Sequence, residues 1–241
     1  MPNNRYFSPE SFAGNQEVTL IDQEFHHLKN VCRAKLGDEI ELINGKGELA
    51  VATVCHFSKM SATANIISIE TQEPLPFTIT LALAFLRPSH LEYAIEKATE
   101  VGVTSFWLFP GDKSEKRDIT DTYLKRLQLI IQGATKQCGR LFLPELVIKK
   151  ELRSCISQEH QLLFGDLCKE ATSLVNIEKL SSNVCLVVGP ESGFSENERK
   201  LLYSMKGTPI SLHPYTFRAE TAAVAGTLLL FNKLILDGKI K

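Results

Sequence analysis

The residues whose types and spacing best suit binding or catalysis lie in two segments near the C-terminus. The first is Gly189-Pro190-Glu191-Ser192-Gly193-Phe194-Ser195, and the second is Leu212–Ala222, which contains Arg218 and Glu220. Glycine in such a loop lets backbone groups approach a ligand closely. Each segment follows a predicted strand and opens a predicted helix, and loops of this kind bind ligands at the carboxyl edge of a parallel sheet. The functional site is therefore expected there.

The elements around these segments follow from local patterns. Val184–Val188 is a short, continuous apolar run, typical of a fully buried parallel strand. Ser195 with Glu198 three residues later forms a capping box, which predicts the start of a helix. Thr208–Leu212 is the next predicted strand, and a long apolar helix follows from about Glu220 to Leu236. Taken singly, each segment is also typical of a plain turn or helix start.

Upstream of these segments, strands and helices alternate. Further strands are expected at Phe77–Phe85, Thr104–Phe109 and Leu162–Gly165. One helix is expected from a Ser89 cap to Gly102, and another from a Thr120 or Asp121 cap to about Cys138. The pattern predicts an α/β domain over residues 74–241, with a mostly parallel sheet and helices on both faces.

The prolines of Thr71–Pro76 mark a domain boundary. Before it, short strand-like runs occur at Glu39–Ile43, Leu49–Val54 and Ala62–Ile69, with a hairpin signal at Asn44-Gly45 and a brief helix expected over His26–Arg33. Residues 1–73 are therefore predicted to form a small, barrel-like β domain.

Composition narrows the functional classes. The chain has 241 residues, of which 44% are hydrophobic and 23% charged, as in soluble globular proteins. Its formal net charge is −1, so any surface that binds nucleic acid must be a local basic patch. We find no apolar run long enough to cross a bilayer and no signal-peptide core, and we expect a cytoplasmic protein without a membrane partner.

The sequence lacks the motifs that are typical of metal sites, of dinucleotide binding and of P-loop phosphate binding. The six cysteines form no CxxC pair and no zinc-type spacing, so neither a metal site nor a disulfide is expected. The first strand-to-helix turn, Leu86–Ser89, contains no glycine, and no phosphate-binding G-x-x-x-x-G-K-[ST] loop occurs. Dinucleotide and P-loop chemistry are therefore disfavoured.

The two C-terminal segments, in this order and spacing, resemble a known family. They look like the GPEGGFS and L-G-x-R-I-L-R-x-E-T-A segments of the RsmE-type 16S ribosomal RNA uridine-N3 methyltransferases, members of the SPOUT (trefoil-knot) superfamily. Further stretches that resemble the family are Arg5–Phe7, His27–Asp38 with Asn44–Gly47, Ile95–Val103 and Thr135–Arg140. The resemblance implies a deep trefoil knot in the C-terminal domain, a PUA-like N-terminal β-barrel that binds RNA, and a homodimer acting on 16S rRNA of the small ribosomal subunit.

The resemblance also implies the cofactor S-adenosylmethionine, bound in the knot. The residues it assigns to the cofactor are Phe164, Gly165, Val188, Gly189, Pro190, Glu191, Gly193, Leu212, His213, Pro214, Phe217, Thr221 and Ala222. Those expected to contact RNA are Arg5, Arg33, Lys35, Lys46, Arg87, Lys97, Gln137 and Arg140, although Lys97 would equally suit a pair with Glu100.

Methylating N3 of uridine requires removal of a weakly acidic imide proton. Arg218 is the candidate cation that stabilises the resulting anion, and Glu220 or Glu191 is the candidate proton acceptor. In the alternative interpretation Arg218 pairs with Glu220 or ends a helix, and the carboxylates cap a helix or hold a ribose hydroxyl.

The chain departs from the family inside the two loops. Ser192 and His213 replace glycines, and Tyr215-Thr216-Phe217 replaces Arg-Ile-Leu. Two other functions stay open, one because it shares the fold and the second because of these changes. One is a ribose 2′-O-methyltransferase of the same fold, and the other is a ribosome-binding assembly factor with impaired catalysis.

Overall fold

The computed structural model describes residues 4–168 and 170–238, which form two compact units. One unit contains the described residues up to Pro74 together with Gln132–Leu143. The other contains Leu75–Ile131 and the described residues from Pro144 onward. The sequence had assigned residues 132–143 to the C-terminal domain, whereas their contacts group them with the N-terminal unit.

The N-terminal unit is a curled five-stranded sheet. Its strands are β1 (Arg5–Phe7), β2 (Glu17–Ile21), β3 (Glu39–Ile43), β4 (Glu48–Phe57) and β5 (Ser61–Thr71), in the order β1-β3-β4-β5-β2. Only the β1–β3 pair is parallel. The register between β4 and β5 shifts twice, after Val51 and after Val54, and such bulges bend and twist a sheet. One face of the sheet buries Tyr6, Phe12 and Leu28.

A short helical stretch connects β2 to β3. It consists of α1 (Asp22–His26) and a π-type turn over His27–Val31, close to the helix predicted at residues 26–33. Arg33, just after it, has a left-handed backbone with φ of 54°.

The β3–β4 connection is a wider loop than the two-residue turn that Asn44-Gly45 suggested. The Asn44 side chain accepts hydrogen bonds from the backbone N–H of Lys46 (2.8 Å) and Glu48 (3.1 Å). Gly47 has φ of 100°, and a Cβ there would lie 2.7 Å from the carbonyl oxygen of Gln72. Its N–H donates to the carbonyl of Leu141 (3.0 Å), so the glycine lets residues 132–143 pack against this loop.

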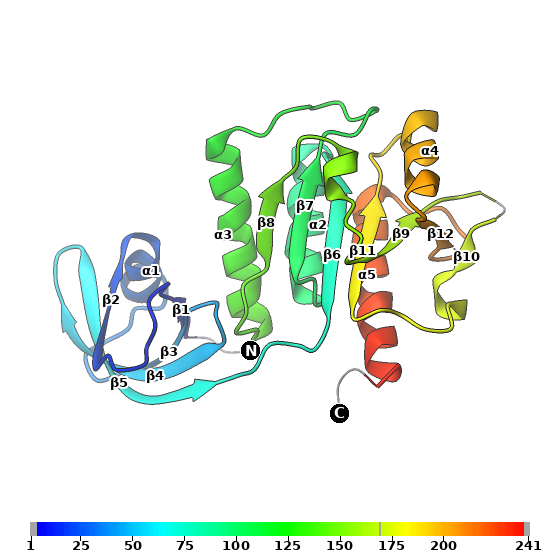
Figure 1. Ribbon diagram of the computed structural model, residues 1–241. Coiled ribbons are helices and arrows are strands. Elements are labelled where there is room, and N and C mark those ends of the chain that lie inside the picture. The colour runs from blue at the N-terminus through cyan, green and yellow to red at the C-terminus, as the bar shows by residue number, and fades with distance from the viewer. Residues whose placement is uncertain (1–3, 169, 239–241) are drawn as a thin grey trace. The chain divides into compact units, whose positions relative to one another are not determined.

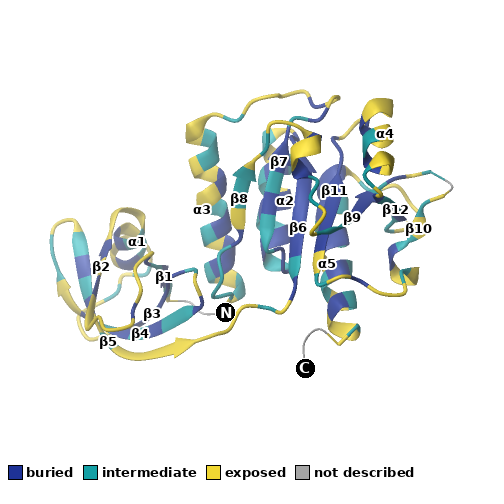
Figure 2. Ribbon diagram, viewed as in Figure 1, coloured by how far each residue is buried: buried dark blue, intermediate teal, exposed yellow. Residues whose placement is uncertain are grey.

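The C-terminal unit is built on a seven-stranded sheet in which every pair of neighbours is parallel, in the order β10-β12-β9-β11-β6-β7-β8 (Figure 1). Its strands are β6 (Thr78–Ala84), β7 (Ser105–Phe109), β8 (Glu145–Ile148), β9 (Gln161–Gly165), β10 (Thr172–Ser173), β11 (Asn183–Val188) and β12 (Thr208–Ser211). Its helices are α2 (Pro88–Glu100), α4 (Glu196–Ser204), α5 (Ala219–Leu236) and the part of α3 (Asp121–Cys138) up to Ile131, with 3-10 turns at Leu152–Cys155 and Leu174–Asn176. Strands β6 and β11 are buried along nearly their whole length (Figure 2).

Most of the predicted elements lie within a residue or two of their predicted bounds, but one cap was wrong. Helix α2 begins at Pro88, and the backbone carbonyl of Arg87 accepts the first helical hydrogen bond, from Leu91 N (2.9 Å). Proline is favoured at this first position because its missing N–H would have no partner there. Ser89 lies inside the first turn and is not the cap. The short strands β1, β2, β8 and β10 were not predicted.

By length and composition alone, helix α5 could cross a membrane. This differs from the sequence analysis, which found no apolar run long enough to do so. In the structure the helix packs against α2 and against strands β6 and β11. Gly226, Leu230 and Leu234 are buried on it, and a Cβ at Gly226 would lie 2.6 Å from Leu186 Cδ2. These contacts are those of a core helix.

Gly102 ends α2 beside α5 and should tolerate no side chain. Its φ is 109°, and a Cβ there would lie 2.3 Å from the Phe231 ring. We expect Gly102→Ala to lower the free energy of unfolding by at least about 2 kcal/mol, because left-handed strain and overpacking add. Gly238→Ala is the matched control, since Gly238 also has positive φ after a helix but open space around it. Equal losses in chemical denaturation of the two variants would contradict the predicted clash.

Candidate active site

A cavity of about 340 Å³ lies at the carboxyl ends of β9, β11 and β12. The residue patterns predicted two neighbouring loops there, after β11 and β12, and the family resemblance added Phe164 and Gly165. The structure places β9 between these strands, so a third loop, Gly165–Leu167, also lines the cavity. Because all three strands are parallel, their carboxyl ends meet at one edge of the sheet.

The loop after β11 is held by a turn and by the predicted capping box. Gly193 has φ of 69°, and its N–H donates to the Pro190 carbonyl (2.7 Å). Ser192 is not left-handed, so the serine that replaces a family glycine causes no backbone strain. Glu198 N donates to Ser195 Oγ (3.0 Å), and Ser195 N donates to Glu198 Oε2 (2.7 Å).

The Glu198 carboxylate also fixes a second loop. Its side chain is buried, and Oε1 accepts a hydrogen bond from the backbone N–H of Asp112, in the loop after β7 (3.0 Å). Lys113 Nζ donates to the Phe194 carbonyl (3.1 Å). These bonds tie the loop after β11 to the loop after β7.

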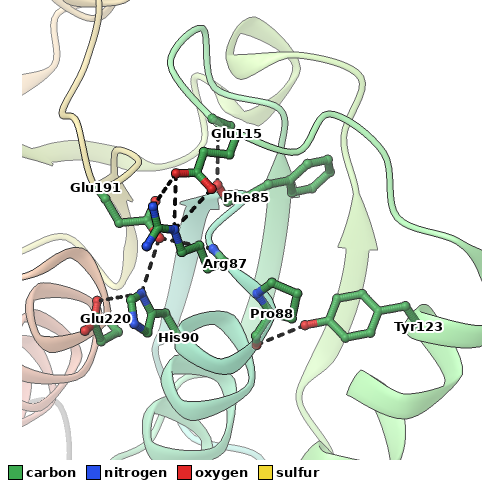
Figure 3. Close-up of polar contacts among 9 residues, drawn as sticks. Phe85, Arg87, Pro88, His90, Glu115, Tyr123, Glu191 and Glu220 are labelled. Atoms are coloured by element: carbon green, nitrogen blue, oxygen red, sulfur yellow. Dashed lines mark hydrogen bonds and ion pairs between the residues drawn. The ribbon is translucent and has the colours of Figure 1, made fainter.

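Two carboxylates converge on one histidine beside the cavity, and Figure 3 shows the arrangement. His90 Nδ1 lies 3.3 Å from Glu191 Oε1 and 3.9 Å from Glu220 Oε2. Glu191 Oε1 also accepts a hydrogen bond from the backbone N–H of Arg87 (3.1 Å). The Arg87 guanidinium donates hydrogen bonds from Nε and Nη2 to the Glu115 carboxylate (Figure 3). Glu191, His90 and Glu220 are called the carboxylate cluster below.

The surroundings of Glu191 favour its ionised form. Burial by itself would raise the pKa of Glu191, but backbone N–H groups, led by that of Arg87, and the His90 ring together lower it below its ordinary value. The first turns of α2 and α5 carry His90 and Glu220, and helix N-termini favour negative charge. The cluster can therefore hold carboxylate charge close to the cavity.

Glu220 and Arg218, the two predicted catalytic residues, differ in their surroundings. The Glu220 side chain is 10% exposed, and its Oε2 has no hydrogen-bond partner among the described residues. Arg218 is exposed at the N-cap position of α5. In the described part of the chain its guanidinium makes no ion pair, so the expected alternative pair with Glu220 is not formed.

Asp166 and Arg199 line the cavity on the β9 side. Asp166 Oδ1 accepts the backbone N–H of Leu167 (2.7 Å) and lies 3.1 Å from Arg199 Nη2. Asp166 Oδ2 is buried and has no partner within the described residues. A buried carboxylate oxygen without a donor is costly, which makes this wall suited to a ligand that brings one.

Aromatic rings form the rim of the cavity along the loop after β12. His213 stacks on Phe217, with ring centres 5.1 Å apart, and meets Tyr215 at 5.3 Å. Tyr215 N donates to His213 Nδ1 (3.2 Å), and the Tyr215 residue is 77% exposed. His213, Tyr215 and Phe217 are called the aromatic rim below. They occupy positions where the family pattern has Gly, Arg and Leu.

The structure places most of the predicted cofactor residues around this cavity. Those that line it are Gly165, Val188, Gly189, Pro190, Glu191, Gly193, Leu212, His213, Phe217 and Ala222. Phe164 lies fully buried beneath the loops, with its ring 6.1 Å from that of Phe194. Pro214 and Thr221 are exposed and are not among the lining residues.

Sequence reasoning missed His90, Asp166 and Arg199. Asp166 directly follows the predicted strand Leu162–Gly165, and an acidic residue at the carboxyl end of a buried strand was a usable signal. Arg199 lies one turn into the predicted helix after Ser195. His90 had no local signal, because its partners are about one hundred residues away in the chain.

Some of the residues predicted to contact RNA form ion pairs within the protein. Arg5, Arg87 and Lys97 are paired with Glu41, with Glu115, and with Glu96 and Glu100 respectively. The hydrogen bonds from Lys97 to Glu100 and Glu96 raise the pKa of Lys97. Burial lowers the pKa of Arg140, and Gln137 is exposed.

Arg33, Lys35 and Lys46 are exposed, and their side chains make no ion pair among the described residues. All three lie in the N-terminal unit. No group of three His, Cys, Asp or Glu residues that could hold a metal ion occurs in residues 4–168 and 170–238, and all six cysteines there are free.

The fold and the site define an RNA methyltransferase. Residues 73–230 match the model of the RNA methyltransferase domain, and residues 20–67 match that of the RNA methyltransferase PUA domain. The chain is 31% identical over 235 residues to the ribosomal RNA small subunit methyltransferase E of Rickettsia conorii, an alignment that covers 93% of each protein. It thus belongs to the ribosomal RNA small subunit methyltransferase E family.

Solved structures agree with this assignment. A ribosomal RNA small subunit methyltransferase E from Neisseria gonorrhoeae, bound to S-adenosyl methionine, superposes with a TM-score of 0.87 at 27% identity, covering 95% of this chain and 97% of that one. A putative methyltransferase from Legionella pneumophila, in complex with the same cofactor, gives a TM-score of 0.89 at 26% identity, covering 97% and 98%.

Removing the His90 ring should raise the pKa of Glu191. We expect the pKa of Glu191 in His90→Ala to move up toward its ordinary value of 4.5, because one hydrogen bond to the ionised form is lost. A carboxyl with a lowered folded pKa stabilises the fold fully above its ordinary pKa, and this contribution disappears as pH falls through the folded value. The variant should therefore lose less unfolding free energy than the wild type on acidification through that range.

NMR titration of the Glu191 carboxyl carbon measures this pKa directly. Ser89→Ala is the matched control, because Ser89 lies on the same turn of α2, is exposed and makes no contact with Glu191. An unchanged or lower pKa of Glu191 in His90→Ala would refute the role of the histidine.

Proposed function

We propose that the protein is an S-adenosylmethionine-dependent methyltransferase that methylates N3 of a specific uridine in 16S rRNA of the small ribosomal subunit. The observation that carries the proposal is the cavity at the carboxyl ends of β9, β11 and β12, in a chain that aligns over nearly its full length with small subunit methyltransferases E. Two similar solved structures contain S-adenosylmethionine.

The residues around the cavity fit this cofactor. Its volume is within the range of roughly 300–1,000 Å³ typical of small-molecule sites. Gly165 and Gly193, where a Cβ would meet nothing within 4 Å, leave backbone groups open to the ligand, and the walls combine apolar side chains with the charged pair of Asp166 and Arg199. When bound, S-adenosylmethionine supplies an electrophilic methyl group.

The protein must take the N3 proton and stabilise the charge left on the base. Arg218 is our candidate for the charge, because its guanidinium is exposed and without a competing ion pair in the described structure. The negative charge of a uridine anion spreads over N3 and its two neighbouring carbonyl oxygens, and a guanidinium suits such a planar acceptor.

Glu220 suits the role of proton acceptor better than Glu191. Glu191 Oε1 is already engaged by His90 and by the backbone N–H of Arg87. Glu220 Oε2 has no hydrogen-bond partner among the described residues and therefore retains an acceptor site, which a proton from N3 or a bridging water can reach after a small side-chain shift. Glu191 would then orient the cluster through His90.

The family assignment supports further properties that we include in the proposal. Helix α5, which packs against α2, β6 and β11, would thread a deep trefoil knot of the SPOUT type, and two chains would form a homodimer. The N-terminal unit would act as the PUA-like RNA-binding domain, with residues 1–73 as its core and 74–241 as the methyltransferase domain. We place the enzyme in the cytoplasm, without a membrane partner.

One observation favours a second function. The aromatic rim replaces family residues around the cavity, as expected for an assembly factor that binds the ribosome but has lost catalysis. Against it, Arg218, Glu220 and Thr221 are retained. A ribose 2′-O-methyltransferase remains a chemical alternative on the same fold.

The decisive test is transfer of labelled methyl from S-adenosylmethionine to small ribosomal subunits that lack the modification, followed by mass analysis of nucleosides. We expect 3-methyluridine. Label on a ribose would identify the 2′-O-methyltransferase instead. Tight binding to the subunit without any label would identify the assembly factor.

Substitution of Arg218 or Glu220 should slow the chemical step. We expect Arg218→Gln and Glu220→Gln to lower kcat about 100-fold to 1,000-fold with little change in the affinity for S-adenosylmethionine, because each group acts mainly on charge that develops during the reaction. Arg153→Gln is the control, since Arg153 is exposed on the 3-10 turn Leu152–Cys155, which contributes no residue to the cavity, whereas Arg218 and Glu220 flank the lining residue Ala219. Unchanged kcat in Glu220→Gln would remove Glu220 as the base.

The unpaired cations of the N-terminal unit should contribute electrostatically to RNA binding. We expect Lys35→Ala to weaken RNA binding and to reduce the slope of log K against log salt by roughly 1, as for loss of one phosphate contact. Lys97→Ala should change the slope less, because two carboxylates already neutralise Lys97. The reverse order of effects in filter binding at several salt concentrations would contradict this assignment.

A further inference from the structure

Tyr215 of the aromatic rim has no role in the chemistry described so far. Tyr215 is a large aromatic residue that is 77% exposed at the edge of the cavity. Leaving such a ring in water gives up the favourable free energy of burying it. An exposed ring of this size next to a ligand cavity therefore calls for a partner.

The ring is also held in place. Tyr215 N donates to His213 Nδ1 (3.2 Å), and the two rings are 5.3 Å apart. His213 in turn stacks on Phe217 at an interplanar angle of 18°, and its carbonyl accepts a hydrogen bond from Ser211 Oγ (3.3 Å). A ring fixed before binding loses little conformational entropy on contact with a ligand.

The chemistry of the substrate points to what the ring meets. N3 of uridine lies on the pairing edge of the base, so an enzyme that methylates it must act on an unpaired base. Proteins bind unpaired RNA bases by stacking them on aromatic side chains. Such stacking needs a flat ring face and no matching charge, which suits a protein of net charge −1.

We propose that the aromatic rim is a stacking platform on which Tyr215 receives an unpaired base of the substrate RNA at the mouth of the cavity. His213 contacts the Tyr215 ring, and Phe217 stacks on His213 in turn. An aromatic face thereby takes over a position at which related enzymes carry an arginine. The inference rests on the proposed function, because the unpaired base follows from methylation at N3 and the cavity is taken as the active site.

The test compares Tyr215→Leu, which removes the flat face but keeps apolar bulk, with Tyr215→Phe, which keeps the face and removes only the hydroxyl. We expect Tyr215→Leu to raise KM for unmodified small subunits, and Kd for them in filter binding, about ten-fold, within the range for loss of one base stack. Tyr215→Phe should stay within about two-fold of the wild type. The affinity for S-adenosylmethionine, measured by calorimetry without RNA, should not change in either variant.

Several outcomes would overturn the proposal. Unchanged RNA affinity in Tyr215→Leu would show that the ring contacts no base. Weaker binding of S-adenosylmethionine would assign the ring to the cofactor, and a change of mass in sedimentation would assign it to a second copy of the chain. Equal damage in Tyr215→Phe would mean that the hydroxyl matters instead of the face.

These results are independent of the modified position. The RNA affinities are measured whether or not 3-methyluridine is formed. Suppose that the wild type forms no 3-methyluridine but that Tyr215→Leu and Tyr215→Phe differ in RNA affinity as expected. The proposed reaction would then be wrong, and the stacking platform would still be supported.

Discussion

The site depends on one buried carboxylate, that of Glu198. It accepts the backbone N–H of Ser195 and that of Asp112, so a single side chain closes the cap of α4 and holds the loop after β7. Hydrogen bonds to a charged acceptor are stronger than neutral ones, and burial shields this one from competing water. With that end of the loop fixed and Gly193 making the turn, Glu191 is directed toward the start of α2.

Glu191 in turn contacts the start of α2 and, through His90, the start of α5. His90, in the first turn of α2, lies between Glu191, in the loop before α4, and Glu220, in the first turn of α5. Each helix N-terminus carries partial positive charge, which offsets part of the repulsion among the carboxylates. The same edge carries the apolar and aromatic walls of the cavity. Charge and apolar surface are thus separated within one site, the carboxylates lying beside α2 and the rings along the loop after β12.

A nearly neutral chain can bind RNA because part of its positive charge is not engaged in ion pairs within the described residues. Arg5, Arg87 and Lys97 are neutralised by neighbouring glutamates, whereas Arg33, Lys35 and Lys46 are exposed without an ion pair in the described structure. Net charge alone therefore underestimates how well a local surface binds RNA, because ion pairing decides which positive charges remain available to phosphate groups. Stacking on an exposed ring would add affinity that needs no net charge.

The sequence by itself determined most of the elements and, through the family resemblance, most of the cavity. The Ser195–Glu198 capping box, the buried strand at Val184–Val188 and the glycine that ends α2 are encoded within a few neighbouring residues, and the structure has all three. Only the tertiary structure decided that β9 lies between β11 and β12, that residues 132–143 join the N-terminal unit, and that His90 meets two glutamates. The physical reason is range: caps, turns and strand patterns depend on residues close in sequence. Strand order and side-chain partners depend instead on which distant segments bury their apolar faces against one another.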